Sequence, residues 1–132
     1  HRACTAGDYR EAARLLERGL PYVSADERPQ WLLIFNRARL EIGAAADAAS
    51  ELMKLTESDP ESPLAVEALL HVGLAHERLG RDDIARKVYT ELQLRPFASE
   101  DLKRRARESL ARLDAREMGG AEGLAGGGAA KP

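Results

Sequence analysis

Cysteine is almost absent from this chain, which contains only Cys4 among its 132 residues. A disulfide within the chain is therefore excluded, and cysteine usage gives no information about the redox compartment. We interpret Cys4 as a small residue that packs between helices. Abundant alanine, arginine and glycine are typical of a GC-rich bacterial genome, and the bacterial periplasm or envelope and the cytoplasm both stay open as locations.

Aromatic residues are also scarce, at 5% of the chain with one tryptophan. Few residues are β-branched, which argues against a large sheet. Leucine and alanine dominate instead, and both are strong helix formers. With 44% hydrophobic and 32% charged residues, the composition is that of an ordinary folded domain. The sequence therefore predicts one all-α domain.

Long apolar runs and a strong net charge are missing as well. The longest apolar run, WLLIF at 31–35, falls far short of the roughly 18 residues that a membrane helix needs, so no membrane span is expected. The net charge of −2 gives no general attraction for nucleic acid, which is not expected as a partner. One basic cluster lies among acidic residues and is interpreted as a solvated face: Lys103, Arg104, Arg105 and Arg107.

Three glycines, Gly7, Gly43 and Gly80, mark a repeated pattern, because they lie 36 and 37 residues apart. An alanine stands five residues after each glycine, and a large apolar residue stands four residues after each alanine. A proline then follows in each unit. The recurring positions are Ala12, Ala48 and Ala85, then Leu16, Leu52 and Tyr89, then Pro21, Pro60 and Pro96. A period of this length predicts a repeat built from pairs of helices.

The last copy shows most clearly how one unit is built. Ser62 is a suitable N-cap, and Pro63 follows in the first turn, where a missing N–H costs nothing. The pattern predicts a first helix over 63–79, which Gly80 ends by adopting a left-handed conformation, and a second helix over 82–94. Two helices cannot bury both apolar faces alone, so the units must stack on one another.

The repeats divide the chain into one helical domain and a tail. The first unit lacks most of its first helix, so we expect further helices upstream in the parent protein. A last helix with a narrow apolar stripe is expected to cap the stack, and the glycine-rich end is expected to be a flexible tail or linker. The predicted segments are a partial repeat over 1–22, repeats over 25–61 and 62–97, a capping helix over 99–117 that completes the domain 1–117, and the tail 118–132.

At these positions the chain resembles the tetratricopeptide repeat (TPR) family, whose pattern is W-x2-L-G-x2-Y, then A-x3-F, then P. The last copy matches it with Leu69, Val72, Gly73, His76, Ala85, Tyr89 and Pro96. The second copy matches it with Leu32, Phe35, Asn36, Arg39, Ala48, Leu52 and Pro60. Leucine replaces the tryptophan, His76 or Arg39 replaces the tyrosine, and Asn36 replaces the glycine. The unit lengths also resemble bacterial envelope repeat proteins of the BamD and CpoB type.

The TPR resemblance implies a right-handed superhelical stack of antiparallel helix pairs, an α-solenoid with a C-terminal capping helix. It also implies an adaptor that binds another protein or peptide on its concave face, which the first helix of each unit lines. By register, the groove candidates are Leu33, Arg37, Leu40, Glu41, Leu70, Leu74, Glu77 and Arg78. Two alternatives stay open, because the leucines could pack between helices and the charged residues could be merely solvated.

The partner class follows from the residues at these positions. Chaperone-binding members of the family hold a peptide carboxylate with Lys, Asn and Arg, whereas the matching positions here are mostly leucine. A clamp of that kind is therefore not expected, and an apolar groove for a helix or an extended segment fits better.

Signs of catalysis or metal binding are missing from the sequence. His71 and His76 lie five residues apart, and metal ligands on one helix need a spacing of three or four to share a face. No nucleophile stands in a recognisable context with a base, so no enzyme activity, cofactor or metal is expected. The leading hypothesis is a protein-binding scaffold. The alternative is a C-terminal regulatory or accessory domain of a larger enzyme.

Overall fold

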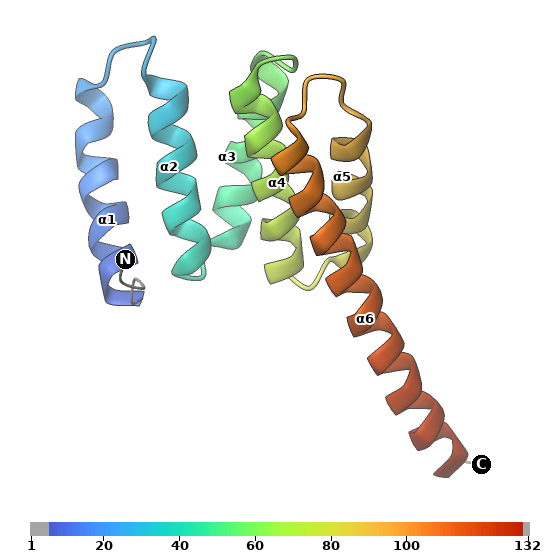
Figure 1. Cartoon of the computed structure of the whole chain (residues 1–132). Helices are drawn as coiled ribbons and strands as arrows, with labels where there is room; N and C mark the ends of the chain where they lie inside the picture. Colours follow the sequence, from blue (N-terminus) through green and yellow to red (C-terminus); the bar gives the residue numbers. More distant parts are fainter. Residues whose placement is uncertain (1–5, 131–132) are drawn as a thin grey trace.

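The computed structural model describes the backbone of residues 6–130 and the side chains of residues 7–119. Over that range the chain is helical and contains no strand (Figure 1), which confirms the predicted all-α class. The elements are α1 (Ala6–Gly19), the 3₁₀ helix η1 (Leu20–Tyr22), α2 (Arg28–Glu41), α3 (Ala45–Ser58), α4 (Pro63–Arg78), α5 (Asp82–Leu94) and α6 (Glu100–Ala130).

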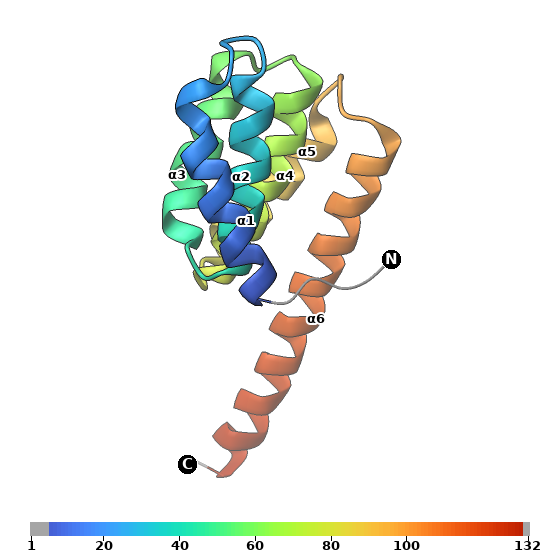
Figure 2. The same ribbon diagram turned by 90° about the vertical axis from the view of Figure 1, so that its left-hand side faces the viewer.

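The helices follow one another in space as they do in the sequence. Each α-helix packs against the next, and α2 also contacts α4, which contacts α6. Figures 1 and 2 show α1 to α5 side by side. Helix α6 lies next to α4 and α5 and extends well beyond the other helices. No helix within residues 6–130 combines the length and apolar character that a membrane span requires.

Two of the three repeated glycines make the predicted turns. Gly43 has a φ of +86° and Gly80 a φ of +75°, a left-handed conformation that side chains with a Cβ adopt poorly. Gly7, the first of the three spaced glycines, forms no such turn, because it lies within the first turn of α1. Residues 1–5, where the end of an earlier helix is expected, lie outside the described part of the chain.

The predicted helix boundaries are close to those observed in the last unit. α5 begins and ends as predicted, and α4 ends one residue early, at Arg78. Ser62 caps α4 by accepting a 3.0 Å hydrogen bond from the backbone N–H of Ala65. Ser99 precedes α6 and accepts the N–H of Leu102 at 3.2 Å.

Helix α6 differs most from its predicted length. It continues past residue 117, the predicted end, and reaches Ala130. Glycine costs a helix about 1 kcal/mol relative to alanine, but it does not block helical geometry as proline does. The glycine-rich segment therefore joins α6 in the structure, up to the last described residue. Its predicted flexibility stays a prediction.

The core consists mainly of leucine and alanine, as the composition predicts. One continuous cluster extends from Leu33 in α2 to Leu113 in α6, and each buried leucine contributes about 1.5–3 kcal/mol to the free energy of folding. A smaller cluster joins α1 to α2. There the indole N–H of Trp31 donates a 2.7 Å hydrogen bond to the carbonyl oxygen of Leu16, which fixes α1 against α2.

Helices α4 and α5 approach each other closely at Gly73. A Cβ atom on Gly73 would overlap the ring of Tyr89, which is fully buried. Glycine therefore makes room for the tyrosine ring. In the second unit the matching positions hold Asn36 and Leu52, both fully buried. Asn36 is larger than Gly73, and Leu52 is smaller than Tyr89. The helix pairs α2–α3 and α4–α5 therefore fill the same space in different ways.

We expect Gly73→Ala to destabilise the protein by about 1–3 kcal/mol, because the added methyl group overlaps the Tyr89 ring. In a Tyr89→Leu background the same substitution should cost much less, since the ring is gone. Urea unfolding of the two single variants and the double variant measures this coupling. An equal cost of Gly73→Ala in both backgrounds would contradict the assigned contact.

Candidate functional site

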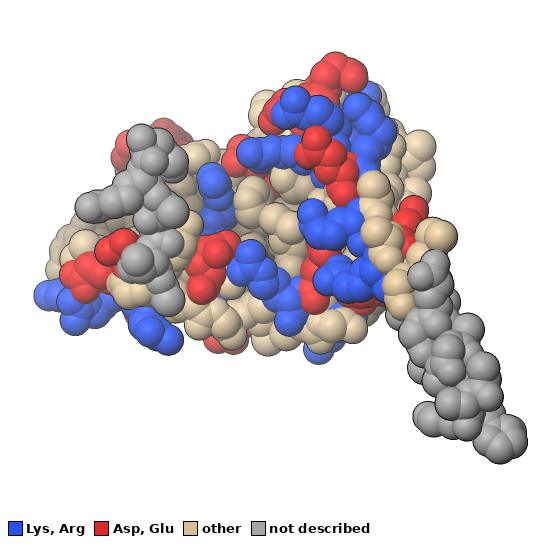
Figure 3. Space-filling model, turned by 60° about the horizontal axis from the view of Figure 1, so that its bottom comes forward, with Lys and Arg blue, Asp and Glu red and all other residues tan. Residues whose placement is uncertain are grey.

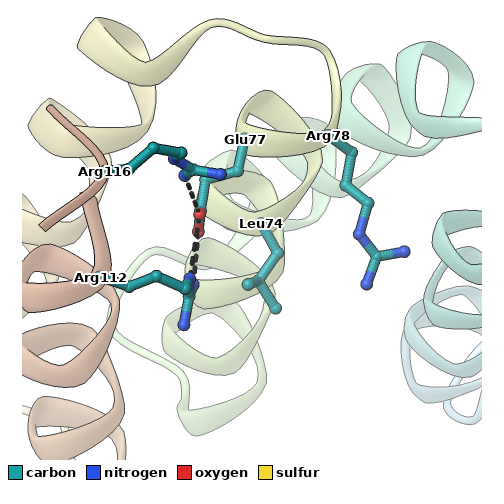
Figure 4. A pocket seen from close by; sticks show the side chains of 5 residues that line it. All are labelled: Leu74, Glu77, Arg78, Arg112 and Arg116. Atoms are coloured by element: carbon teal, nitrogen blue, oxygen red, sulfur yellow. Dashed lines mark hydrogen bonds and ion pairs between the residues drawn. The ribbon is translucent and has the colours of Figure 1, made fainter. Parts of the chain in front are cut away.

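Two adjoining hollows open along α2, α4 and α6, and Leu74 lines both of them. The cationic hollow has a volume of about 390 Å³ and is lined by Leu74, Glu77, Arg78, Arg112 and Arg116 (Figure 4). The apolar hollow has a volume of about 360 Å³, extends toward α1 and is lined mainly by Tyr9, Leu16, Ile34, Leu40 and Leu74. Residues far apart in the sequence thus form two hollows that share Leu74, and the two together are called the recess.

The four predicted groove leucines occupy different environments. Leu33 and Leu70 are 0% and 3% exposed and belong to the core, so they pack between helices and do not face a partner. Leu40 is also buried, although it lines the apolar hollow. Leu74 is half-buried and lines both hollows. Of the four, Leu74 has the clearest access to a partner.

The exposed charged candidates connect α2 to α4. The guanidinium of Arg37 lies 3.7 Å from the carboxylate of Glu67. Arg78 forms a 3.0 Å ion pair with Glu41 and donates a hydrogen bond to the carbonyl oxygen of Leu40. That carbonyl belongs to the last turn of α2, where carbonyl groups have no partner within the helix. Arg78 therefore caps α2 while it lines the cationic hollow.

Glu77 is the centre of the cationic hollow and differs from the expected groove charge. Its side chain is only 8% exposed, and its carboxylate lies 2.6 Å from Arg112 and 2.8 Å from Arg116, both on α6. The hydroxyl of Tyr89 on α5 donates a further hydrogen bond to it. Figure 4 shows both arginines reaching from α6 toward Glu77. One carboxylate thus joins three helices, which is why it tolerates burial.

The protonation states agree with this geometry. Burial by itself raises the pKa of Glu77, but hydrogen bonds from Arg112, Tyr89 and Arg116 outweigh it and hold that pKa below its ordinary value. Burial, together with the hydrogen bond to Glu77, raises the pKa of the Tyr89 hydroxyl. The hydrogen bond to Glu77 likewise raises the pKa of Arg112. The hollow is therefore lined by a charged carboxylate and charged guanidinium groups, and the neutral phenol of Tyr89 is buried behind the carboxylate.

Arg112 and Arg116 are site residues that the sequence pattern does not predict. They stand four residues apart and so share a face of α6, and this spacing is the only signal that could have pointed to them. In the predicted basic cluster on the same helix, two arginines pair with a nearby acidic residue of that helix. Arg104 and Arg105 both pair with Asp101, and all three are exposed, as expected for a solvated face.

The two histidines of α4 have separate environments. Nδ1 of His71 lies 3.0 Å from the carbonyl oxygen of Glu67, and burial lowers the pKa of His71. Nδ1 of His76 is buried and has no hydrogen-bond partner among the described residues, and burial, then Arg81, lowers its pKa. Over the part of the chain that the structure describes, His, Cys, Asp and Glu do not form a group of three or more that could hold a metal ion.

No family model matches this chain, and neither a curated protein nor a solved structure matches it at a significant level. The TPR resemblance therefore rests on the residues and spacings of this sequence. Because one fold supports many functions, function has to be inferred from the recess itself.

The pKa shift of Glu77 predicts how stability depends on pH. A carboxyl group with a lowered pKa contributes stability that is present above its ordinary pKa of 4.5 and is lost as the pH falls through the folded-state pKa. Glu77→Gln should therefore be less stable at neutral pH by about 1–3 kcal/mol and should lose less stability below about pH 4.5 than the wild type.

Urea unfolding at several pH values measures both effects. Glu57→Gln is the matched control, since it removes an exposed carboxyl group on α3 and should leave the pH dependence unchanged. If Glu77→Gln followed the wild-type pH profile, the ionised carboxylate would not contribute to stability in this way.

The burial of the leucines predicts opposite outcomes for two neighbouring substitutions. Leu70→Glu places a charge in the core and should unfold the domain, since an unpaired buried charge costs several kcal/mol. Leu74→Glu places the charge among the arginines of the recess and should preserve helicity. Circular dichroism and thermal unfolding distinguish the variants, and a folded Leu70→Glu protein would contradict the assigned core.

Proposed function

We propose that this chain is a protein-binding scaffold of the TPR type, in which the helix pairs α2–α3 and α4–α5 form successive repeats and α6 caps them. The recurrence of left-handed Gly43 and Gly80 at equivalent turns supports this proposal. The contacts of α2 with α4 and of α4 with α6 support it too, because the first helices of stacked units adjoin one another in such a fold. The partner is a helix or an extended segment of another protein.

The observation that carries this proposal is the recess, whose two hollows share Leu74. Its two hollows, of about 390 and 360 Å³, suit the insertion of a few side chains of a peptide. Leu74 provides apolar surface where the hollows meet, and exposed arginines provide polar contacts beside it. This combination of an apolar centre with a polar rim is typical of protein interfaces.

The charged groups of the recess behave as recognition and structural groups. Arg78 caps a helix, and Glu77 orients two arginines. Such contacts hold a surface in one shape, and a partner that fits it then binds with little loss of side-chain freedom.

A peptide selection tests the proposal even though the partner is unidentified. We expect the wild-type protein to enrich peptides from a random library of 16-residue sequences displayed on phage. Leu74→Glu should weaken the binding of an enriched peptide at least about tenfold, because it places a charge at the centre of the recess. Fluorescence polarisation with the labelled peptide measures this effect.

Leu94→Glu is the matched control, since Leu94 is 78% exposed on α5 and does not line the recess. It should bind the enriched peptide as the wild type does. The proposal is overturned if no peptide is enriched, or if folded Leu74→Glu binds the peptide with unchanged affinity.

A further inference from the structure

The cationic hollow presents positive charge to whatever enters it. The side chains of Arg78, Arg112 and Arg116 are 41%, 50% and 49% exposed, whereas that of Glu77 is 8% exposed. The carboxylate thus lies beneath the guanidinium groups and not beside them at the surface. A ligand entering the hollow meets three cations first, although the chain as a whole has a net charge of −2.

Two of these arginines are already held in place. Glu77 accepts hydrogen bonds from Nε and Nη2 of Arg112 and from Nη2 of Arg116. A guanidinium has five N–H donors in a fixed plane, so these contacts leave further donors to reach an incoming acceptor. The buried carboxylate therefore orients the arginines before any ligand arrives, which lowers the entropic cost of binding.

The third arginine reaches the hollow from the opposite side of Leu74 (Figure 4). Its contacts with Glu41 and with the Leu40 carbonyl hold Arg78 against the end of α2. The hollow is thus bounded by cations of α4 and α6, and Leu74 lies between them next to the apolar hollow. Because Leu74 also lines the apolar hollow, a segment bound in the cationic hollow has apolar surface beside it.

We propose that the partner segment is acidic: an aspartate or glutamate side chain of it occupies the cationic hollow, and an adjacent apolar side chain occupies the apolar hollow. This inference rests on the proposed scaffold function and specifies the chemistry of its partner. Carboxylates are planar acceptors that match the paired N–H donors of arginine, and three arginines line this hollow.

The surroundings favour an acidic protein over a nucleic acid. Glu41 lies next to Arg78, and Asp82 lies 3.5 Å from Arg116, so carboxylates flank the hollow on both sides. Figure 3 shows basic and acidic side chains interspersed on the face that it views. A polyanion with a phosphate at every nucleotide would meet these carboxylates, whereas a segment with a single acidic side chain would meet only the arginines.

The test compares acidic peptides with their neutral counterparts on two arginine variants. We expect the selected peptides to be enriched in Asp or Glu next to an apolar residue. Replacing the acidic residue by Asn or Gln should weaken binding to the wild type about tenfold, and added salt should weaken the acidic peptide most. Arg78→Gln combined with Arg116→Gln should abolish this difference between the two peptides.

Arg14→Gln combined with Arg104→Gln is the control, because both arginines are exposed, pair within their own helix and lie outside the recess. This control should retain the preference for the acidic peptide. Circular dichroism verifies that both double variants are folded.

The outcomes separate this inference from the scaffold function. Enriched peptides that are neutral or basic, but that Leu74→Glu no longer binds, would overturn the acidic partner and leave the scaffold intact. The absence of any enriched peptide would overturn both. Tighter binding of a 20-nucleotide single-stranded DNA than of the acidic peptide, lost in Arg78→Gln with Arg116→Gln, would overturn the acidic partner in favour of a nucleic acid.

Discussion

Tyr89 is the residue that organises the packing of the last three helices. Its ring lies against Gly73 of α4, where no side chain larger than hydrogen fits, and its hydroxyl donates a hydrogen bond to Glu77 on the same helix. Glu77 in turn holds Arg112 and Arg116 of α6. A single buried phenol therefore combines the apolar contact between α4 and α5 with the polar contact that attaches α6.

The contacts of Glu77 with Tyr89, Arg112 and Arg116 also determine the charge of the recess. A buried carboxylate is costly unless charged or polar groups satisfy it, and here two guanidinium groups and a phenol do so. The same contacts orient the arginines at the surface of the cationic hollow. The side chains that line the cationic hollow are therefore also the ones that attach α6 to α4.

The helix pair α2–α3 fills the matching space with different residues. Asn36 takes the place of Gly73, and its amide donates hydrogen bonds to the carbonyl of Leu32 at 2.8 Å and to Glu51 of α3 at 2.9 Å. Arg39 donates to the Asn36 oxygen and lies over the Phe35 ring, 4.2 Å from its centre. A partly buried polar network thus stands here where α4 and α5 have the glycine–tyrosine contact.

Local signals in the sequence are enough to place the helices, whereas the recess depends on how whole helices pack. Ser62 and Ser99 cap the helices that follow them, and Gly80 supplies a left-handed turn, each within a few residues of the chain. Gly7 has the same spacing as the turn glycines but lies in α1, since a glycine forms a turn only where the backbone adopts the left-handed conformation. The sequence pattern predicts both Leu70 and Leu74 as groove residues, but neighbouring helices cover Leu70 and leave Leu74 half-exposed.

The ion pairs of the recess show most clearly what the sequence pattern does not predict. Arg112 and Arg116 meet Glu77 across more than thirty positions of sequence, where no periodicity could pair them. Caps, turns and helix propensity act between neighbouring residues, so the amino-acid order alone predicts them. Burial and ion pairing act between residues that only folding brings together, and for that reason the packed helices, and not the sequence pattern, set the shape and charge of the recess.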